Sequence, residues 1–103
     1  MAKDIDNALL RLVEALKDTD EYREYMRAKA KITQADMGNI RSYKNLRASL
    51  MISPSEENEN RAREICKNLM LDLDTRNYML CEKKVLSMVA GIYDEIGSGL
   101  KII

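Results

Sequence analysis

Apolar residues near the start of the chain recur at steps of three and four. The set consists of Ile5, Ala8, Leu9, Leu12, Val13 and Leu16. This spacing gathers them on one face of an α-helix. Asp18, Thr19 and Asp20 follow, and their side-chain oxygens predict that this helix stops near Asp18 and that another begins. Asp18 and Glu21 have the spacing of a capping box for that next helix, with Asp in place of Ser or Thr.

The segment from Asp20 to Met51 contains no proline and only one glycine, Gly38. A single helix over these residues would extend about 48 Å. Its apolar stripe is thin and consists of Tyr22, Tyr25, Met26, Ala30, Met37, Ile40, Tyr43, Leu46 and Leu50. A kink or break near Gly38–Asn39 is the alternative, because glycine inside a helix costs about 1 kcal/mol relative to alanine.

The clearest helix boundary in the sequence is Ser53-Pro54-Ser55-Glu56. Serine can cap a helix, proline suits the first helical position, and glutamate can complete a capping box, so a third helix is predicted to begin here. One face of this helix would carry Ala62, Ile65, Cys66, Leu69, Met70 and Leu73. We expect the helix to end near Asp72 to Thr75.

The last segment has the most regular pattern, with alternating steps of four and three. Its residues are Tyr78, Glu82, Val85, Val89, Ile92 and Ile96, with Met79, Leu86 and Tyr93 beside them. Such a stripe is typical of helix-on-helix packing of the coiled-coil type, within one chain or between copies. The helix should end at Gly97-Ser98-Gly99. The sequence thus predicts an all-α bundle of about four helices in a single domain spanning residues 1–103.

Composition agrees with the helices and limits the range of functions. The 17 basic and 17 acidic residues balance, so no net charge attracts nucleic acid or keeps copies of the chain apart, which favours a homo-oligomer. Charges interrupt the N-terminal apolar residues, unlike those of a secretory signal. No stretch approaches the roughly 18 apolar residues of a membrane span. We therefore expect a cytoplasmic protein without membrane insertion.

The chain contains no histidine, which is the commonest general base and metal ligand. We therefore expect a non-enzymatic protein with no catalytic residues and no cofactor. Cys66 and Cys81 are the candidate metal ligands, but their separation does not match the close cysteine pairs of zinc or redox motifs. Buried, reduced core thiols are the favoured interpretation. An iron–sulfur cluster would require further ligands from another chain.

Two groups of residues are candidates for binding surfaces. Arg41, Lys44 and Arg47 have helical spacing and could contact phosphates. Acidic residues nearby favour an ordinary solvated helix face, so direct contact with nucleic acid is not expected. Tyr and Met are enriched at protein interfaces. The predicted interface therefore combines Tyr and Met residues of the segment from Asp20 to Met51 with residues of the stripe in the last segment. Its residues are Tyr22, Tyr25, Met26, Tyr43, Tyr78, Val85, Val89, Ile92 and Ile96.

The order of these features resembles the YlbF/YmcA/YheA family of small bacterial helical proteins. Asp20-Glu21-Tyr22 followed by Tyr25, the proline-containing turn, and the C-terminal YMLCEKKVLSMVAGIYDEIG carry the resemblance over nearly the whole chain. It implies a helical bundle with a long helical hairpin, oligomer formation and no enzymatic site. It also implies an accessory role, with partner proteins of a regulatory complex, in the control of competence, biofilm formation and sporulation.

Two alternatives follow from the same resemblance. Some family members act as partners of a membrane-associated endoribonuclease, in a complex that can bind iron–sulfur clusters. The chain would then be an RNA-associated accessory factor or an iron–sulfur protein. Cluster-binding members place a cysteine near the C-terminus, whereas this sequence ends GSGLKII. Its basic stretch from Arg41 to Arg47 also differs from the glutamine-rich helix of the family.

Overall fold

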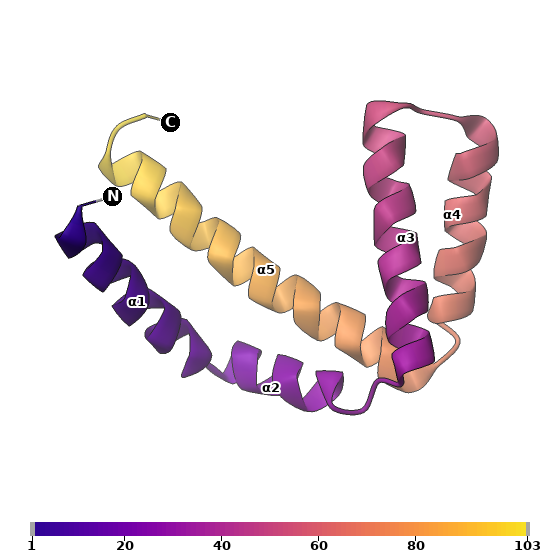
Figure 1. Ribbon diagram of the computed structural model, residues 1–103, viewed down its shortest axis with the longest axis horizontal. Helices are drawn as coiled ribbons and strands as arrows, with labels where there is room; N and C mark the ends of the chain where they lie inside the picture. The colour runs from indigo at the N-terminus through magenta and orange to yellow at the C-terminus, as the bar shows by residue number, and fades with distance from the viewer. Residues whose placement is uncertain (1, 103) are drawn as a thin grey trace. The chain divides into compact units, whose positions relative to one another are not determined.

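A computed structural model describes residues 2–102 of the chain as helices joined by short turns (Figure 1). The helices are α1 (Lys3–Lys17), α2 (Asp20–Lys29), α3 (Gln34–Ile52), α4 (Glu56–Leu69) and α5 (Leu73–Gly99). This span holds no strand. The predicted all-α class is confirmed, but the described residues form five helices instead of about four. None of these five is both long and apolar enough to cross a membrane.

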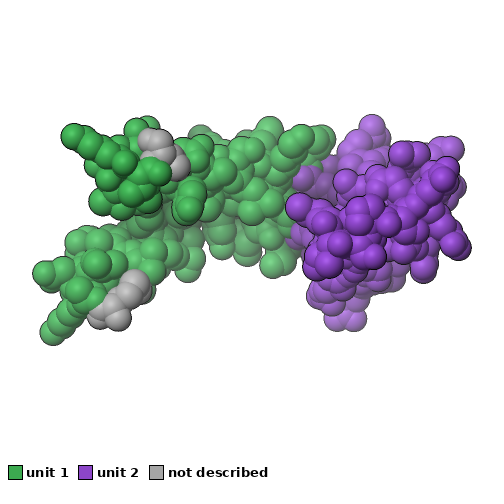
Figure 2. Space-filling view, turned by 90° about the horizontal axis from the view of Figure 1, so that it is seen from above, with its two compact units in different colours: residues 1–29, 80–103 green, residues 30–79 purple. Residues whose placement is uncertain are grey.

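The helices are distributed over two compact units, which Figure 2 shows in different colours. Unit 1 contains α1, α2 and the part of α5 from Leu80 onward, and unit 2 covers residues 30–79, with α3, α4 and the start of α5. Within unit 1, α1 and α2 follow one another along one side, and α5 returns along the other in the opposite direction (Figure 1). The prediction of a single folding domain stays a prediction.

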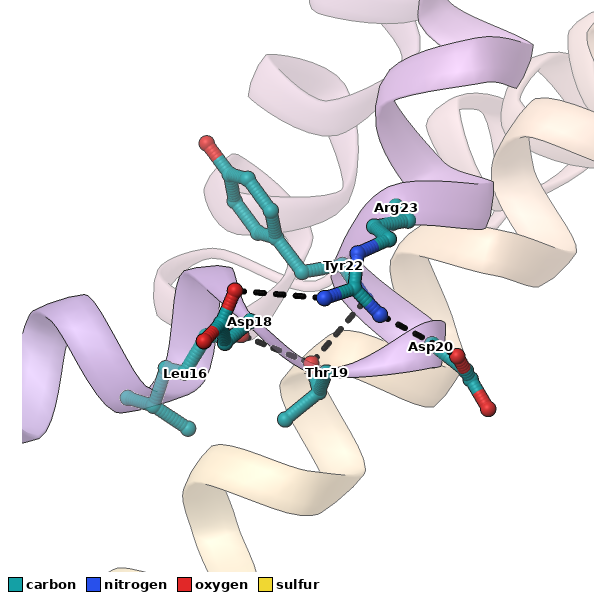
Figure 3. Close-up of polar contacts among 6 residues, drawn as sticks. All are labelled: Leu16, Asp18, Thr19, Asp20, Tyr22 and Arg23. Atoms are coloured by element: carbon teal, nitrogen blue, oxygen red, sulfur yellow. Dashed lines mark hydrogen bonds and ion pairs between the residues drawn. The ribbon is translucent and has the colours of Figure 1, made fainter.

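The junction between α1 and α2 is held by Thr19. Its Oγ1 donates a hydrogen bond to the Leu16 carbonyl at 2.7 Å and accepts one from the Tyr22 amide at 3.2 Å (Figure 3). The predicted end of the first helix near Asp18 is confirmed. The capping box at Asp18 was wrong, because the Asp18 carboxylate pairs with Arg23 at 3.1 Å and leaves the capping position to Thr19.

The predicted continuous helix from Asp20 to Met51 was wrong, and so was the alternative break near Gly38–Asn39. The chain leaves the helix at residues 30–33, and Gly38 lies inside α3. Thr33 starts α3 because its side chain accepts a hydrogen bond from the Asp36 amide at 3.1 Å. A threonine followed by an acidic residue three positions later is a recognisable start signal, because the threonine oxygen can accept a hydrogen bond from the helix N-terminus.

Helices α3 and α4 pack against each other as a helical hairpin in unit 2 (Figure 1). The predicted start of a helix after Pro54 is confirmed, but the cap is Ser55, whose side chain accepts from the Asn58 amide at 3.3 Å. Pro54 therefore precedes the cap and does not occupy the first helical position. The buried residues of the hairpin are Ile40 and Leu50 on α3 and Ala62 and Leu69 on α4.

The turn from α4 to α5 comes earlier than predicted. Helix α4 ends at Leu69, and Asp72 caps the next helix in place of continuing this one. One oxygen of its carboxylate, Oδ2, accepts from the Thr75 amide at 3.1 Å and from the Thr75 hydroxyl at 2.7 Å. Thr75 is 1% exposed. Helix α5 then runs to Gly99, which confirms its predicted end at the glycine pair.

Candidate interaction surface

Helix α1 has a clear apolar face but no buried residue. Ile5 is 57% exposed, Leu9 49% and Val13 38%. Leu12 and Leu16, on the same face, are half-buried. Large apolar side chains at this spacing normally turn toward a core. The rest of the described chain thus leaves much of this face uncovered.

Helix α5 is covered along one side and open along another. Cys81 is buried, and Val85 and Ile92 are half-buried. A second line of apolar side chains is 43 to 72% exposed and alternates steps of three and four along unit 1. We call this line the exposed stripe of α5; it consists of Leu86, Val89, Tyr93, Ile96 and Leu100.

The predicted interface residues of the final segment therefore fall into three groups. Tyr78 is 3% exposed and belongs to the core, Val85 and Ile92 are half-buried, and Val89 and Ile96 lie in the exposed stripe. Sequence reasoning set Leu86 and Tyr93 beside the stripe and left Leu100 in the tail. The steps of three and four from residue 86 to residue 100 could have revealed this line of side chains, because such spacing places them on one face of the helix, next to the predicted stripe.

The aromatic residues of α2 lie together in unit 1. The Tyr22 and Tyr25 rings are 6.2 Å apart at 46°, and the Lys29 ammonium lies 5.9 Å from the centre of the Tyr25 ring. Both tyrosines are half-buried, and Met26 is 43% exposed. This part of the predicted interface thus presents mainly Met26 to the outside.

Tyr43 lies apart from these residues, in the α3–α4 hairpin of unit 2. Burial raises the pKa of its phenol, and its hydrogen bond with the Cys66 side chain raises that pKa further. Beside it the Arg47 guanidinium bonds the Glu59 carboxylate at 2.9 Å, which joins α3 to α4. The half-buried tyrosine thus serves the packing of the hairpin.

The candidate nucleic-acid residues of α3 do not form an uninterrupted basic surface. Arg47 is paired with Glu59, and Lys44 also interacts within the chain. Arg41 is exposed. Pairing with a carboxylate removes much of the attraction of Arg47 for a phosphate.

The two cysteines lie in different units, and neither forms a disulfide. Cys81 is buried and Cys66 is half-buried. Within residues 2–102, no three His, Cys, Asp or Glu side chains come together as metal ligands would. Cys66 is in contact with Tyr43, as described above.

A cavity of about 300 Å³ opens at the base of the hairpin, wholly within unit 2. It is lined by Asp36, Asn39, Ser42, Ile65, Asn68, Leu69, Asp72 and Thr75. The Thr75 side chain and amide, by hydrogen bonding, lower the pKa of the Asp72 carboxyl below its usual value of 3.8. The carboxylate is thus engaged in starting α5.

This cap predicts a pH dependence of stability. Since the folded-state pKa of Asp72 is lowered, its ionised form stabilises the fold above the usual pKa, and that contribution is lost as the pH falls through the lowered value. We expect the melting temperature of Asp72→Asn to fall below that of the unaltered chain at pH 7, by a difference that shrinks below pH 4. Thermal unfolding followed by circular dichroism measures it. Glu64→Gln, on an exposed part of α4, should show no such trend.

Residues 5–101 of the chain match the family described as control of competence regulator ComK, YlbF/YmcA. This match covers nearly all of the 103 residues. The chain belongs to the YlbF/YmcA family. The resemblance noted from the sequence is confirmed, and with it the general role of a regulator. Searches of curated proteins and of solved structures found no match to this YlbF/YmcA family member.

Proposed function

We propose that this YlbF/YmcA family member is a non-enzymatic, cytoplasmic regulatory protein that self-associates and binds partner proteins in bacterial developmental control. The observation that carries the proposal is the uncovered apolar surface of unit 1. It comprises the α1 face at Ile5, Leu9 and Val13 and the exposed stripe of α5. A sequence without histidine and a family of regulators of ComK support a role in binding instead of catalysis.

The physical argument rests on the cost of leaving this surface in water. Covering apolar surface contributes about 25 cal/mol per Å². Contiguous exposed apolar patches on soluble proteins mark sites of interaction. Here two helices of one unit, α1 and α5, each carry such a line of side chains. A second copy of the chain presents the same apolar helix faces. Because the net charge is zero, no long-range repulsion keeps two copies apart.

Sedimentation equilibrium over the micromolar range tests the self-association. The expected result is a mass of two or more chains that rises with concentration, because the covered apolar area stabilises the assembly. A single-chain mass at every concentration would contradict the proposal. Circular dichroism of the same samples shows that the helices are folded.

A further inference from the structure

The cavity at the base of the α3–α4 hairpin is polar where two packed helices normally bury apolar side chains. On α3, it is lined by Asp36, Asn39 and Ser42, whose steps of three keep them on one side of the helix. Nearer the other end of the hairpin, Leu50 of α3 and Ala62 of α4 are buried. Polar residues on the side of a helix that meets another helix weaken the packing, so such positions commonly serve a function.

The cavity combines an apolar wall with negative charge. Its apolar wall comes from α4, where Ile65 is half-buried and Leu69 is buried. Asp36 is half-buried, and within residues 2–102 its carboxylate has no hydrogen-bond or ion-pair partner. Hydrogen bonds from Thr75 favour the ionised form of Asp72. Among the described residues that line the cavity there is no lysine or arginine, so no side-chain cation offsets these two charges.

These features define the chemistry of a ligand for the cavity. Its volume of about 300 Å³ is at the lower end of the range of ligand pockets, which suits a small group. The negative charges select a cation, and the side-chain carbonyls of Asn39 and Asn68 add hydrogen-bond acceptors. A guanidinium is planar, carries five N–H donors and is more weakly hydrated than an ammonium ion. Its alkyl stem can lie against Ile65 and Leu69, as the stems of arginine side chains lie on apolar surfaces.

We propose that this cavity binds an alkyl guanidinium group, with Asp36 as the residue that pairs with the cation. The cavity lies within unit 2, whereas the uncovered apolar surface lies in unit 1, so the proposal does not depend on self-association. The guanidinium belongs either to a free small molecule or to an arginine side chain of another protein, and both present the same chemistry to the cavity. The N-terminus of α3 offsets part of the Asp36 charge, which keeps the affinity low.

NMR spectroscopy of the whole chain tests the site, with butylguanidinium chloride as the probe and sodium chloride added to hold the ionic strength constant. The side-chain amide signals of Asn39 and Asn68 should shift and saturate, with a dissociation constant on the order of 1 mM. Butylurea has the same shape without the charge and should bind at least about 10-fold more weakly. The capped peptide acetyl-Ala-Arg-Ala-amide distinguishes the two sources. Tighter binding of the peptide would indicate an arginine of another protein, and tighter binding of butylguanidinium would indicate a free small molecule.

Asp36→Asn removes the charge and leaves the Asp36 amide that Thr33 caps, and it should bind butylguanidinium about 10-fold more weakly. Glu57→Gln is the matched control, because Glu57 is also an acidic residue in the first turn of its helix and lies about 16 Å along α4 from Asn68. It should bind within about 2-fold of the unaltered chain. Absence of saturation, equal binding of butylurea, unaltered binding by Asp36→Asn or an equal loss in Glu57→Gln would each overturn the site. Circular dichroism compares the helical content of the variants.

Discussion

The Val89→Asp variant is expected to be a monomer at concentrations at which the unaltered chain is a dimer or larger. Val89 is 43% exposed in the single chain, so a carboxylate there stays hydrated and the helix can form. In a contact between two copies through the exposed stripe, the carboxylate would be buried among apolar side chains. An uncompensated charge in a contact costs about 3 kcal/mol or more, which corresponds to at least about 100-fold weaker association. Sedimentation equilibrium measures it.

Ser87→Asp is the matched control for that variant. Ser87 is exposed and lies on the same helix, about 160° around it from Val89. The same charge is added, but away from the exposed stripe, and the mass should remain that of the unaltered assembly. Equal masses for Val89→Asp and the unaltered chain would show that the stripe is not the contact.

Replacing Ile40 by alanine is expected to lower the free energy of unfolding by about 2 to 5 kcal/mol. Ile40 is 1% exposed and, among residues 2–102, is the largest apolar side chain that is fully buried. Its loss leaves a cavity in the α3–α4 hairpin, which the rigid helix backbones cannot close completely. For a domain whose total stability is about 5 to 15 kcal/mol, this is a large fraction.

Urea unfolding at one fixed protein concentration measures this effect, since assembly makes stability depend on concentration. Arg41→Ala is the control, because Arg41 is the next residue and is exposed. We expect it to change the free energy of unfolding by no more than about 0.5 kcal/mol. A similar loss in both variants would show that burial of the Ile40 side chain does not determine the cost.

Much of the helical structure could be predicted because each helix has a local cause. The end of α1 near Asp18 and the start of α4 after Pro54 follow from side-chain oxygens and a proline, which act within one turn. The break at residues 30–33 was missed because helix propensity alone favours continuation there. The capping bond from Thr33 to the Asp36 amide determines the start of α3 instead. Gly38 stays helical, and a Cβ atom at this position would meet no other segment of the chain within 4 Å.

The interaction surface was predictable in kind but not in detail. Spacing placed apolar residues on one side of α5, and the structure shows which of them the chain itself covers. Tyr78 is buried in the core, whereas Leu100 is exposed, as are Val89 and Ile96. Periodicity gives the direction of a side chain from its helix axis. It does not give the position of the neighbouring helices, which decides exposure.

Because α1 has no buried residue, we expect the conformation of this helix to depend on the concentration of the protein. A helix of 15 residues is close to the length at which an isolated peptide is only marginally helical in water. Leu12 and Leu16 are only half-buried by the chain, so the order of α1 depends in part on a cover over Ile5, Leu9 and Val13. In the proposed assembly, dilution removes that cover, so this end of the chain would fray first and become accessible to proteases. Scarce protein would be degraded faster than abundant protein, which sharpens the response of a regulator to its own level of synthesis.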